Sequence, residues 1–248
     1  MMYKKITLFA VIFLAATLWF FNNGHDIISE MTEKECSDDR FCSFEELDDE
    51  YEEGSDYEVI NRTEGDEQWL FSAIHGGGIE ETTSTLAEAA SGSSYPFYAF
   101  KGKLSSNNFS NLHITSTHFD EPRALDMVSK ADHHIAVHGA AGTESKTMIG
   151  GLDEKLKEIV RRHLEEKGFV VTGTPDHLNG EHPDNYTNKT KTEQGVQLEI
   201  TRGQRKEFFK NGDISFSSRN DPSNETQAFK DYVEALREAV KTYESSNE

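Results

Sequence analysis

Four residues of this chain have the side-chain types and the spacing of a hydrolytic metal site: His75, Glu80, His138 and Glu199. His75 and His138 each end a short apolar run, and Glu80 follows His75 by five positions. Two imidazoles and a carboxylate supply three of the ligands that a catalytic zinc ion takes, and the fourth position stays open for water. Zinc lowers the pKa of that water to about 7, so the water can attack an amide carbonyl near neutral pH.

Glu199 is an acid within the mostly apolar, strand-like run Val196–Ile200. A buried glutamate needs a polar partner, and a metal-bound water would be one. Amide hydrolysis also needs a group that moves a proton from the water to the leaving amine. Glu199 is therefore the candidate general base, in a mechanism that forms no covalent enzyme intermediate.

Residue types and spacing leave other interpretations open. Histidines at strand ends are often packed and hydrogen-bonded without a metal, and the chain has 10 histidines. The run Gly76–Gly78 could form an oxyanion or phosphate loop, although it lacks the Lys-Ser/Thr pair of a P-loop. A serine nucleophile is not favoured, because the chain has no Gly-x-Ser-x-Gly elbow.

The segments that carry these residues alternate between strand-like and helix-like patterns. This alternation predicts an α/β fold, a single domain whose mixed, mostly parallel sheet is flanked by helices. Ligands of such sheets gather beyond the carboxyl ends of the strands, where His75 and His138 fall. The predicted strands are 70–74, 95–101, 112–117, 135–138, 169–172 and 196–200, and the predicted helices are 86–90, 122–127, 153–167 and 227–243.

The N-terminus has the pattern of an export signal. Lys4 and Lys5 precede the apolar stretch Ile6–Phe21, which is slightly shorter than the roughly 20 residues of a membrane-spanning helix. Since basic residues precede the stretch and acids follow it, we expect the protein to be secreted or anchored on the outer face of the membrane. A buried N-terminal helix is the alternative. The expected divisions are 1–24 as signal peptide or signal anchor, 25–40 as acidic linker and 41–248 as catalytic domain.

The charge and the cysteines limit the possible partners and compartments. The formal net charge is −20, and many of the acids lie between Asp26 and Glu67. Such a balance disfavours duplex DNA, whose binding needs a basic face. The two cysteines, Cys36 and Cys42, could form a small-loop disulfide outside the cytoplasm or could have no structural role, and they are too few for a structural zinc site.

Five short motifs occur in a fixed order along the chain: AIHGGGIE (73–80), LHITSTHFDEP (112–122), VHG (137–139), IGGLD (149–153) and GVQLEI (195–200). Together they resemble the phage-type poly-γ-glutamate hydrolases, over roughly Phe44 to Tyr243. That family is similar to the zinc carboxypeptidases in a compact form, and its members cleave γ-glutamyl amide bonds in poly-γ-glutamate. The resemblance implies Zn²⁺ as cofactor, with His75, Glu80 and His138 as its ligands and Glu199 as general base.

The chain departs from the carboxypeptidase pattern at two places. Zinc carboxypeptidases usually space the first ligand pair as His-x-x-Glu, whereas His75 and Glu80 are spaced as His-x4-Glu. The intervening glycines allow the wider loop. The family also tends to have Asn-Arg where this chain has Asn188-Lys189. Lysine lacks the planar fork of arginine, which puts bidentate binding of a substrate carboxylate at this position in doubt.

A polyanionic substrate requires a locally basic groove on this acidic protein. The candidates to bind substrate carboxylates are cationic residues near the motifs, although each could equally be an ordinary solvated surface charge. His118 could contact substrate or orient a ligand, and a structural role is the alternative for it and for His113. The residues proposed to bind substrate are Arg123, Lys189, Lys191, Arg202, Arg205 and His118.

The sequence therefore predicts a zinc-dependent, endo-acting hydrolase of poly-γ-glutamate that works as a monomer and binds no nucleic acid. A zinc amidase or carboxypeptidase of γ-linked glutamyl peptides from the cell wall is a close alternative, because the chemistry is shared. A non-enzymatic acidic envelope protein on the same fold is a third interpretation, against which the presence of all three ligands and Glu199 argues.

Overall fold

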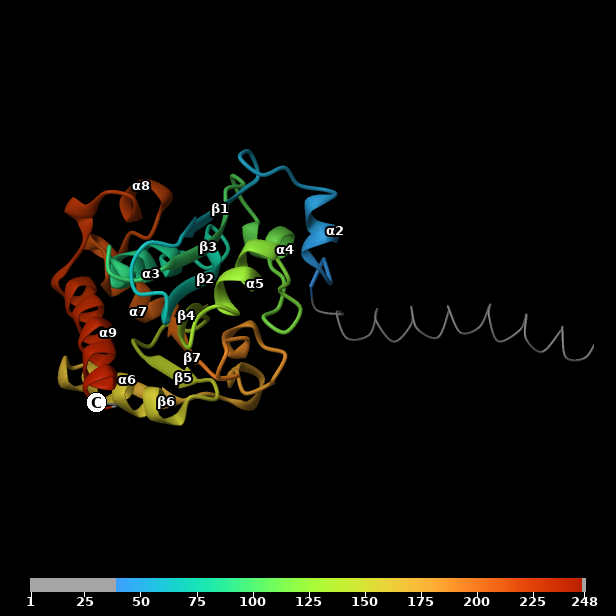
Figure 1. The fold of residues 1–248 in the computed structure, drawn as a ribbon. Helices are drawn as coiled ribbons and strands as arrows, with labels where there is room; N and C mark the ends of the chain where they lie inside the picture. The colour runs from blue at the N-terminus through green and yellow to red at the C-terminus, as the bar shows by residue number, and fades with distance from the viewer. Residues whose placement is uncertain (1–38, 247–248) are drawn as a thin grey trace, which may run out of the picture. The chain divides into compact units, whose positions relative to one another are not determined.

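Seven strands form one sheet in the computed structural model, which describes residues 39–246 (Figure 1). The strands lie in the order β1-β3-β2-β4-β7-β5-β6, and four of the six strand pairs are parallel. The predicted fold class, a mixed and mostly parallel sheet flanked by helices, is confirmed. The strands are β1 (Tyr57–Arg62), β2 (Trp69–Gly77), β3 (Phe97–Gly102), β4 (His133–Ala140), β5 (Thr147–Gly150), β6 (Val171–Gly173) and β7 (Val196–Thr201).

The central strands are buried on both faces, which explains their continuous apolar sequences. All nine residues of β2 and all six of β7 are buried. A strand covered on both faces cannot alternate apolar with polar residues, because both sets of side chains point into a core. The few polar side chains on these strands therefore need partners inside the protein.

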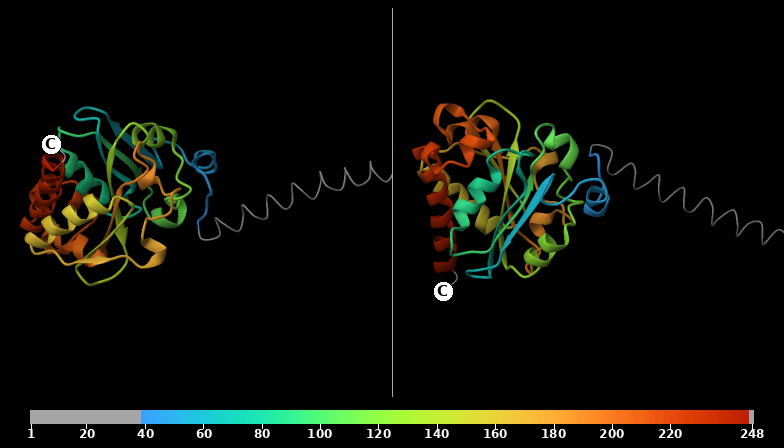
Figure 2. Two further views of the ribbon diagram at one scale, coloured as in Figure 1. Left: turned by 60° about the horizontal axis from the view of Figure 1, so that its bottom comes forward. Right: turned by 90° about the horizontal axis from the view of Figure 1, so that it is seen from above.

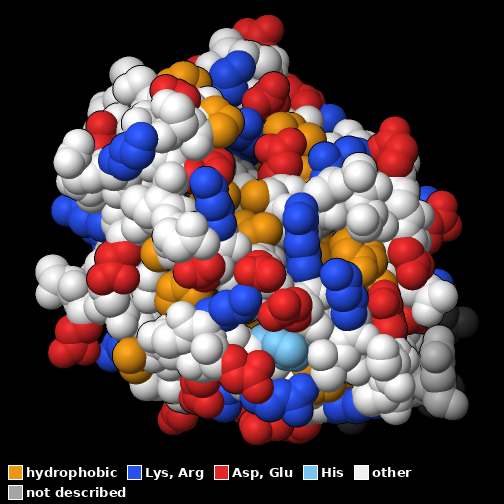
Figure 3. All heavy atoms as spheres, turned by 90° about the vertical axis from the view of Figure 1, so that its left-hand side faces the viewer, with side chains coloured by type: hydrophobic (Ala, Val, Ile, Leu, Met, Phe, Trp, Pro, Cys, Tyr) orange, Lys and Arg blue, Asp and Glu red, His pale blue; other side chains and the backbone are white. Residues whose placement is uncertain are grey.

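Long amphipathic helices cover one face of the sheet. They are α3 (Thr83–Ser91), α6 (Glu154–Glu166) and α9 (Gln227–Ser245), and Figure 2 shows them together on one side of the strands. Their apolar stripes pack with the sheet into one core, and polar residues cover their outer side. On the side where α8 and α9 lie, acidic and basic side chains are intermixed (Figure 3). One ion pair between the helices joins Lys167, at the end of α6, to Glu234 of α9 at 2.8 Å.

Short helices and loops cover the other face. They are α2 (Phe44–Asp48), α4 (Asn108–Leu112) and α5 (Pro122–Val128), around a second, aromatic-rich core. The remaining elements are short and lie in connections. They are α7 (Arg202–Glu207), α8 (Phe216–Arg219) and the 3₁₀ turns η1 (Asp176–Leu178), η2 (Tyr186–Asn188), η3 (Lys210–Gly212) and η4 (Pro222–Asn224).

One predicted strand is wrong, and two strands of the sheet were not predicted. The predicted strand at 112–117 is wrong, because the chain leaves α4 at Leu112 and continues as a turn rather than pairing with the sheet. Strands β1 and β5 were not predicted from the sequence. Strand β5 is only four residues long, and β1 pairs with a single neighbour, β3, and is half-exposed. Such strands lack the long apolar run by which a central strand is found.

The predicted signal or anchor at 1–24 lies outside the described residues, as does the predicted linker except for Asp39 and Arg40. Cys42 is disulfide-bonded, and Cys36, the other cysteine of the sequence, also lies outside them. Within residues 39–246, no helix has the length and apolar composition needed to cross a membrane.

Candidate active site

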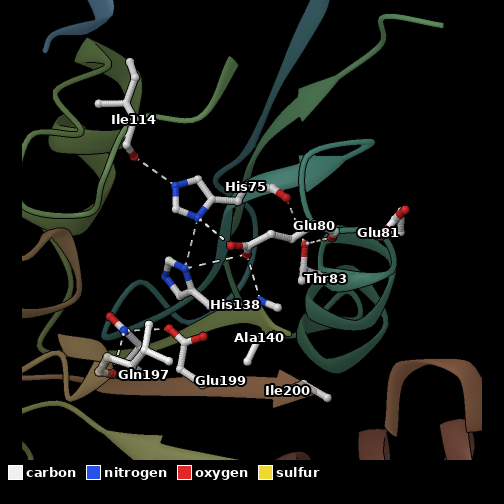
Figure 4. A network of polar contacts seen from close by, with 12 residues as sticks. His75, Glu80, Glu81, Thr83, Ile114, His138, Ala140, Gln197, Glu199 and Ile200 are labelled. Carbon is white, nitrogen blue, oxygen red and sulfur yellow. Dashed lines mark hydrogen bonds and ion pairs between the residues drawn. The ribbon is translucent and has the colours of Figure 1, made fainter. Parts of the chain in front are cut away.

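Three neighbouring strands bring the predicted ligands and the predicted base together (Figure 4). His75 is near the carboxyl end of β2, His138 is on β4 and Glu199 is on β7. Strand β4 runs parallel to both neighbours, and His138 and Glu199 face each other in register. All of these side chains are buried, so the site forms at the inner part of the sheet rather than on a surface loop.

The glycine-rich turn after β2 returns the chain so that Glu80 faces His75. Gly77 has a left-handed φ of +64°, and a Cβ there would lie 2.4 Å from the Gly102 carbonyl oxygen. The turn closes where the Glu80 amide donates to the His75 carbonyl at 2.9 Å. The Thr83 hydroxyl then donates to the Glu80 carbonyl at 2.9 Å. The His-x4-Glu spacing thus produces a ligand pair on one side of a tight turn.

A backbone carbonyl determines the tautomer of His75. Its Nε2 lies 2.9 Å from the Ile114 carbonyl oxygen, which can only accept a hydrogen bond, so Nε2 carries the hydrogen. The Nδ1 lone pair is then available and points to Glu80 Oε1 at 3.3 Å and to His138 Nδ1 at 3.2 Å. Metal-binding imidazoles commonly have their second nitrogen fixed in this way.

His138 completes a set of three ligands that fits a tetrahedral metal ion. The rings of His75 and His138 lie 5.0 Å apart and nearly perpendicular, at 76°, with their Nδ1 atoms directed at a common point. Glu80 Oε2 lies 3.9 Å from His138 Nδ1. Two nitrogens bound to one tetrahedral zinc ion are about 3.3 Å apart, given Zn–N bonds of about 2.0–2.1 Å. The separation of 3.2 Å is close to that value, so the donor set fits zinc.

The electrostatics of the three groups suit their proposed roles. Burial acts to raise the pKa of Glu80, but the interactions with His75, with His138 and with the Gly139 amide at 2.7 Å outweigh it and lower this pKa. Burial and the neighbouring His75 lower the pKa of His138 to about 3. Glu80 is therefore a carboxylate and His138 a neutral imidazole, the forms that bind a metal ion.

Glu199 lies beside the ligands with the opposite shift. Burial and the charge of Glu80 raise its pKa well above the usual value, against the lowering effect of Gln197, whose amide donates to Glu199 Oε1 at 2.9 Å. A carboxyl group with a raised pKa accepts a proton more readily near neutral pH than an ordinary glutamate. The structure therefore brings together all four residues that the sequence singled out for chemistry.

A cavity of about 510 Å³ opens beside these residues. Within the part of the chain that the structure describes, its wall contains no lysine or arginine. Its polar side chains are histidines, amides, hydroxyls, one aspartate and the two glutamates Glu80 and Glu199. The lining residues are His75, Glu80, Phe109, His113, Thr115, Ser116, Thr117, His138, Gly139, Ala140, Ala141, Asp176, His177, Leu178, Asn179, Gly180, His182, Asn185, Gln197 and Glu199.

The cations predicted to bind substrate do not line this cavity. Among residues 39–246, the cavity is therefore not the basic groove that the sequence predicted. Arg123 makes a fork of hydrogen bonds to Glu53 and a further bond to Glu121. Arg202 pairs with Glu81 at 3.1 Å. Each of these guanidinium groups already has a carboxylate partner from this chain.

The other residues predicted to bind substrate also lie outside the cavity wall. Lys189 pairs with Asp184 at 2.8 Å, and Lys191 lies 3.4 Å from Asp132. Arg205 is buried and donates to three backbone carbonyls. His118 is half-buried, and its Nδ1 has no hydrogen-bond partner within residues 39–246.

The sequence interpretation missed one aromatic residue and one loop of the cavity wall, and it treated His113 only in part. Phe109 and the 176–182 loop had no predicted role, and His113 was mentioned with a structural role as the alternative. His113 offers a nitrogen within 4.8 Å of ligand atoms of both His75 and Glu80. The signal that could have found it is its position in the LHITSTHFDEP motif, next to the residue whose carbonyl fixes His75.

Residues 41–235 match the model of a protein family described as poly-gamma-glutamate hydrolase. The chain belongs to this family. Among its curated relatives, the SPbeta prophage-derived protein YoqZ of Bacillus subtilis (strain 168) is 39% identical over 204 residues, 82% of this chain and 72% of YoqZ. YndL of the same organism is 40% identical over 202 residues, 81% of this chain and 77% of YndL.

Two solved structures extend this likeness to three dimensions. A bacteriophage poly-gamma-glutamate hydrolase superposes with a TM-score of 0.79 at 34% identity, covering 84% of this chain and 99% of that one. A zinc-free apo form of YndL superposes with a TM-score of 0.73 at 37% identity, covering 82% and 98%. The match to this family therefore spans all seven strands of the sheet and the residues of the candidate site.

Proposed function

We propose that this member of the family is a zinc-dependent, endo-acting hydrolase of the γ-glutamyl amide bonds of poly-γ-glutamate. The observation that carries the proposal is the convergence of His75 Nδ1, Glu80 and His138 Nδ1 beside the buried carboxyl of Glu199. The zinc-free description of the YndL structure supports zinc as the metal of this family. Zinc, when bound, supplies a positive charge that activates water and polarises the carbonyl.

The residues of the chain have distinct roles in this mechanism. His75, Glu80 and His138 would hold the ion. Glu199 takes the proton that water loses as the new carbon–oxygen bond forms. It then passes this proton to the amide nitrogen as the carbon–nitrogen bond breaks. Gln197 donates to Glu199 Oε1 at 2.9 Å and thereby orients the carboxyl toward the cavity.

The test follows polymer length. The full chain is incubated with poly-γ-glutamate, with and without a chelator, and the products are separated on a gel. We expect a smooth fall in length that stops with chelator and returns when zinc is added. His138→Ala should lose zinc and activity together. Glu199→Gln should keep zinc and lower kcat by about 10²–10⁴-fold, the range for removing a general base.

A matched control is Glu158→Gln, because Glu158 is an exposed glutamate on α6. It should behave as the unaltered protein. Zinc binding without polymer shortening would reject the polymer as substrate and direct the test to γ-glutamyl peptides of the cell wall. Stepwise release of single glutamates would replace endo with exo cleavage. Failure to bind zinc would reject the metal site.

We propose also that the protein works outside the cytoplasm. The disulfide at Cys42 supports this location, since disulfides persist in oxidising compartments and are rare in reducing ones. The measurement is the amount of protein in the medium, the membrane and the cytoplasm of expressing cells, with the thiols counted by alkylation and mass spectrometry. Reduced protein found only in the cytoplasm would contradict the proposal.

A further inference from the structure

His113 lies in the cavity wall, between the rings of Phe109 and His75. Its ring centroid is 4.0 Å from that of His75, with the planes at 32°, and 4.5 Å from that of Phe109, with the planes at 29°. Three rings thus contact one another in series, from the mouth of the cavity, where Phe109 is 53% exposed, to the buried His75. Close contact with both rings restricts the rotation of the His113 ring, so its nitrogens have a defined direction.

His113 could itself offer a ligand atom beside His75 and Glu80, but its ring contacts His75 in a different way from the ring of His138. A metal ion lies in the plane of each imidazole that binds it. The nearly perpendicular rings of His75 and His138 meet this condition, because their Nδ1 atoms approach to 3.2 Å. Two rings that overlap at 4.0 Å and 32° have planes that run beside each other. His113 therefore contacts His75 ring against ring, and one of its nitrogens reaches the space beside the ligand atoms of His75 and Glu80.

That space is where the carbonyl oxygen of a substrate amide must lie. One nitrogen of His113 is within 4.8 Å of ligand atoms of His75 and Glu80, so it borders the open side of the site. Negative charge develops on the carbonyl oxygen as water attacks, and a fixed donor aimed at this oxygen stabilises it. No lysine or arginine among residues 39–246 lines the cavity to serve this purpose.

We propose that His113 is a catalytic residue that donates an N–H hydrogen bond to the carbonyl oxygen of the scissile amide. The inference rests on the proposed amide hydrolysis. The water oxygen bonds to the carbonyl carbon, the carbon–oxygen π pair moves onto the carbonyl oxygen, and Glu199 takes the proton of the water. The pair then returns, the carbon–nitrogen bond breaks and the amine leaves with that proton. His113 keeps its own proton throughout.

The experiment compares His113→Ala, His113→Gln and Ser110→Ala in the full chain. Ser110 is an exposed residue of α4, the short helix that ends directly before His113, and its variant controls for changes in that segment. Three quantities are measured. They are zinc affinity by competition with a chromogenic chelator, kcat and KM on a γ-glutamyl oligomer, and the affinity for a γ-glutamyl phosphinate, whose tetrahedral oxygens imitate the attacked carbonyl.

We expect His113→Ala to keep zinc affinity and KM within a few-fold, while kcat falls by about 10²–10³-fold, the effect of removing one such donor. Phosphinate affinity should fall by a comparable factor. His113→Gln should recover part of both losses, because its amide can still donate. Ser110→Ala should match the unaltered protein in all three measurements.

Two results would overturn the inference. Loss of zinc affinity in His113→Ala would make His113 a metal ligand, and unchanged kcat and phosphinate affinity would make it a wall residue. Failure of the proposed function would look different, because the unaltered, zinc-loaded protein would leave every γ-glutamyl substrate intact. In that case the phosphinate affinities of the unaltered protein and of His113→Ala decide whether His113 contacts a tetrahedral oxygen.

Discussion

At the scale of single residues, Arg205 connects the backbone segments that carry the ligands. Its Nε donates to the Ile200 carbonyl at 3.1 Å, and its two terminal nitrogens donate to the carbonyls of Glu81 at 2.7 Å and Ala140 at 3.2 Å. These carbonyls follow Glu199, Glu80 and Gly139 in the chain. A guanidinium group offers five donors in a rigid fork, which suits a junction of three carbonyls. Arg205 was predicted to bind substrate, and the structure gives it this supporting position.

Replacement of Arg205 by methionine should weaken both the fold and the metal site. Three buried carbonyls would lose their donor, and we expect the free energy of unfolding to fall by roughly 2–4 kcal/mol. Zinc affinity should fall about 10–100-fold, as for other groups that support metal ligands. Chemical denaturation and chelator competition measure the two effects.

Arg202→Met is the matched control for this variant. Arg202 pairs with the same Glu81, but its side chain is 49% exposed. Exposed ion pairs contribute at most about 1 kcal/mol, so its removal should change stability little and zinc affinity not at all. Equal effects in the two variants would contradict the assignment.

The sequence could predict the metal ligands and Glu199 because their chemistry depends on residue type and on position at strand ends. It could not separate Arg205 from Arg202. Both follow β7 within a few positions, and only the packing decides that one is buried under Gly139 while the other is exposed. A Cβ at Gly139 would lie 2.8 Å from Arg205 Cζ. That close approach depends on the three-dimensional arrangement of β4 and α7.

At the scale of elements, His134 joins two strands to the turn η2. Its ring is fully buried on β4, with Nε2 at 2.7 Å from the Ser72 hydroxyl and Nδ1 at 3.0 Å from the Thr187 carbonyl. The carbonyl requires a hydrogen on Nδ1, so Nε2 accepts from the hydroxyl and the ring is neutral. Burial lowers the pKa of His134 to about 4, against a raising effect of the bond to Thr187.

This burial predicts a loss of stability in acid. The pKa of His134 is about 4 in the folded protein and 6.5 in an unfolded chain. The unfolded state therefore binds more protons in this window, and the contribution of His134 to stability is lost as pH falls from 6.5 toward 4. The slope contributed is at most about 1.4 kcal/mol per pH unit. Denaturant unfolding of zinc-loaded protein at several pH values measures it.

His134→Gln should be less stable at pH 7 but should depend less on pH across that window. His177→Gln is the control, since His177 is exposed and its replacement should leave the pH dependence unchanged. A variant His134→Gln with the full acid sensitivity of the unaltered protein would show that other groups cause it.

The elements were predictable to different degrees for a physical reason. The sequence predicted β2, β4 and β7 because both of their faces are buried and their apolar runs are continuous. The segment 112–117 alternates apolar and polar residues as a strand can, but it is an irregular loop that supplies the Ile114 carbonyl to His75. The Ile114 carbonyl accepts a hydrogen bond from a side chain instead of from a neighbouring strand. The local pattern of apolar and polar residues does not show which of these partners a carbonyl has.

At the scale of the whole molecule, the formal net charge of −20 opposes a polyanionic substrate. The cations that were expected to attract the polymer are paired with carboxylates or buried, and they do not line the cavity. Within the described residues, carboxylate groups that enter this cavity meet amide, hydroxyl and imidazole donors. Attraction at close range is then made by hydrogen bonds, while the long-range field is repulsive.

We therefore expect salt to increase polymer cleavage at low substrate concentration. Raising the ionic strength from about 0.01 M to 0.15 M shortens the Debye length from about 30 Å to about 8 Å. The repulsion between protein and polymer falls, and the initial rate should rise up to about ten-fold. The rate is followed by the appearance of new amino termini.

A short γ-glutamyl substrate with amidated carboxyl groups is the control, and its cleavage should not depend on salt. A rate that falls with added salt on the polymer alone would show instead that cations outside the cavity guide the substrate.

The position of the ligand-bearing strands within the sheet has a consequence for exchange of the metal. Strands β2, β4 and β7 are the third, fourth and fifth of seven, and each has a hydrogen-bonded neighbour on both edges. Amide protons in such strands exchange with deuterium only when the whole domain opens. Most of the ligand framework should thus keep its slow exchange after chelation. The protein could then release and regain its ion many times without refolding, and metal supply rather than folding would set the fraction of active molecules.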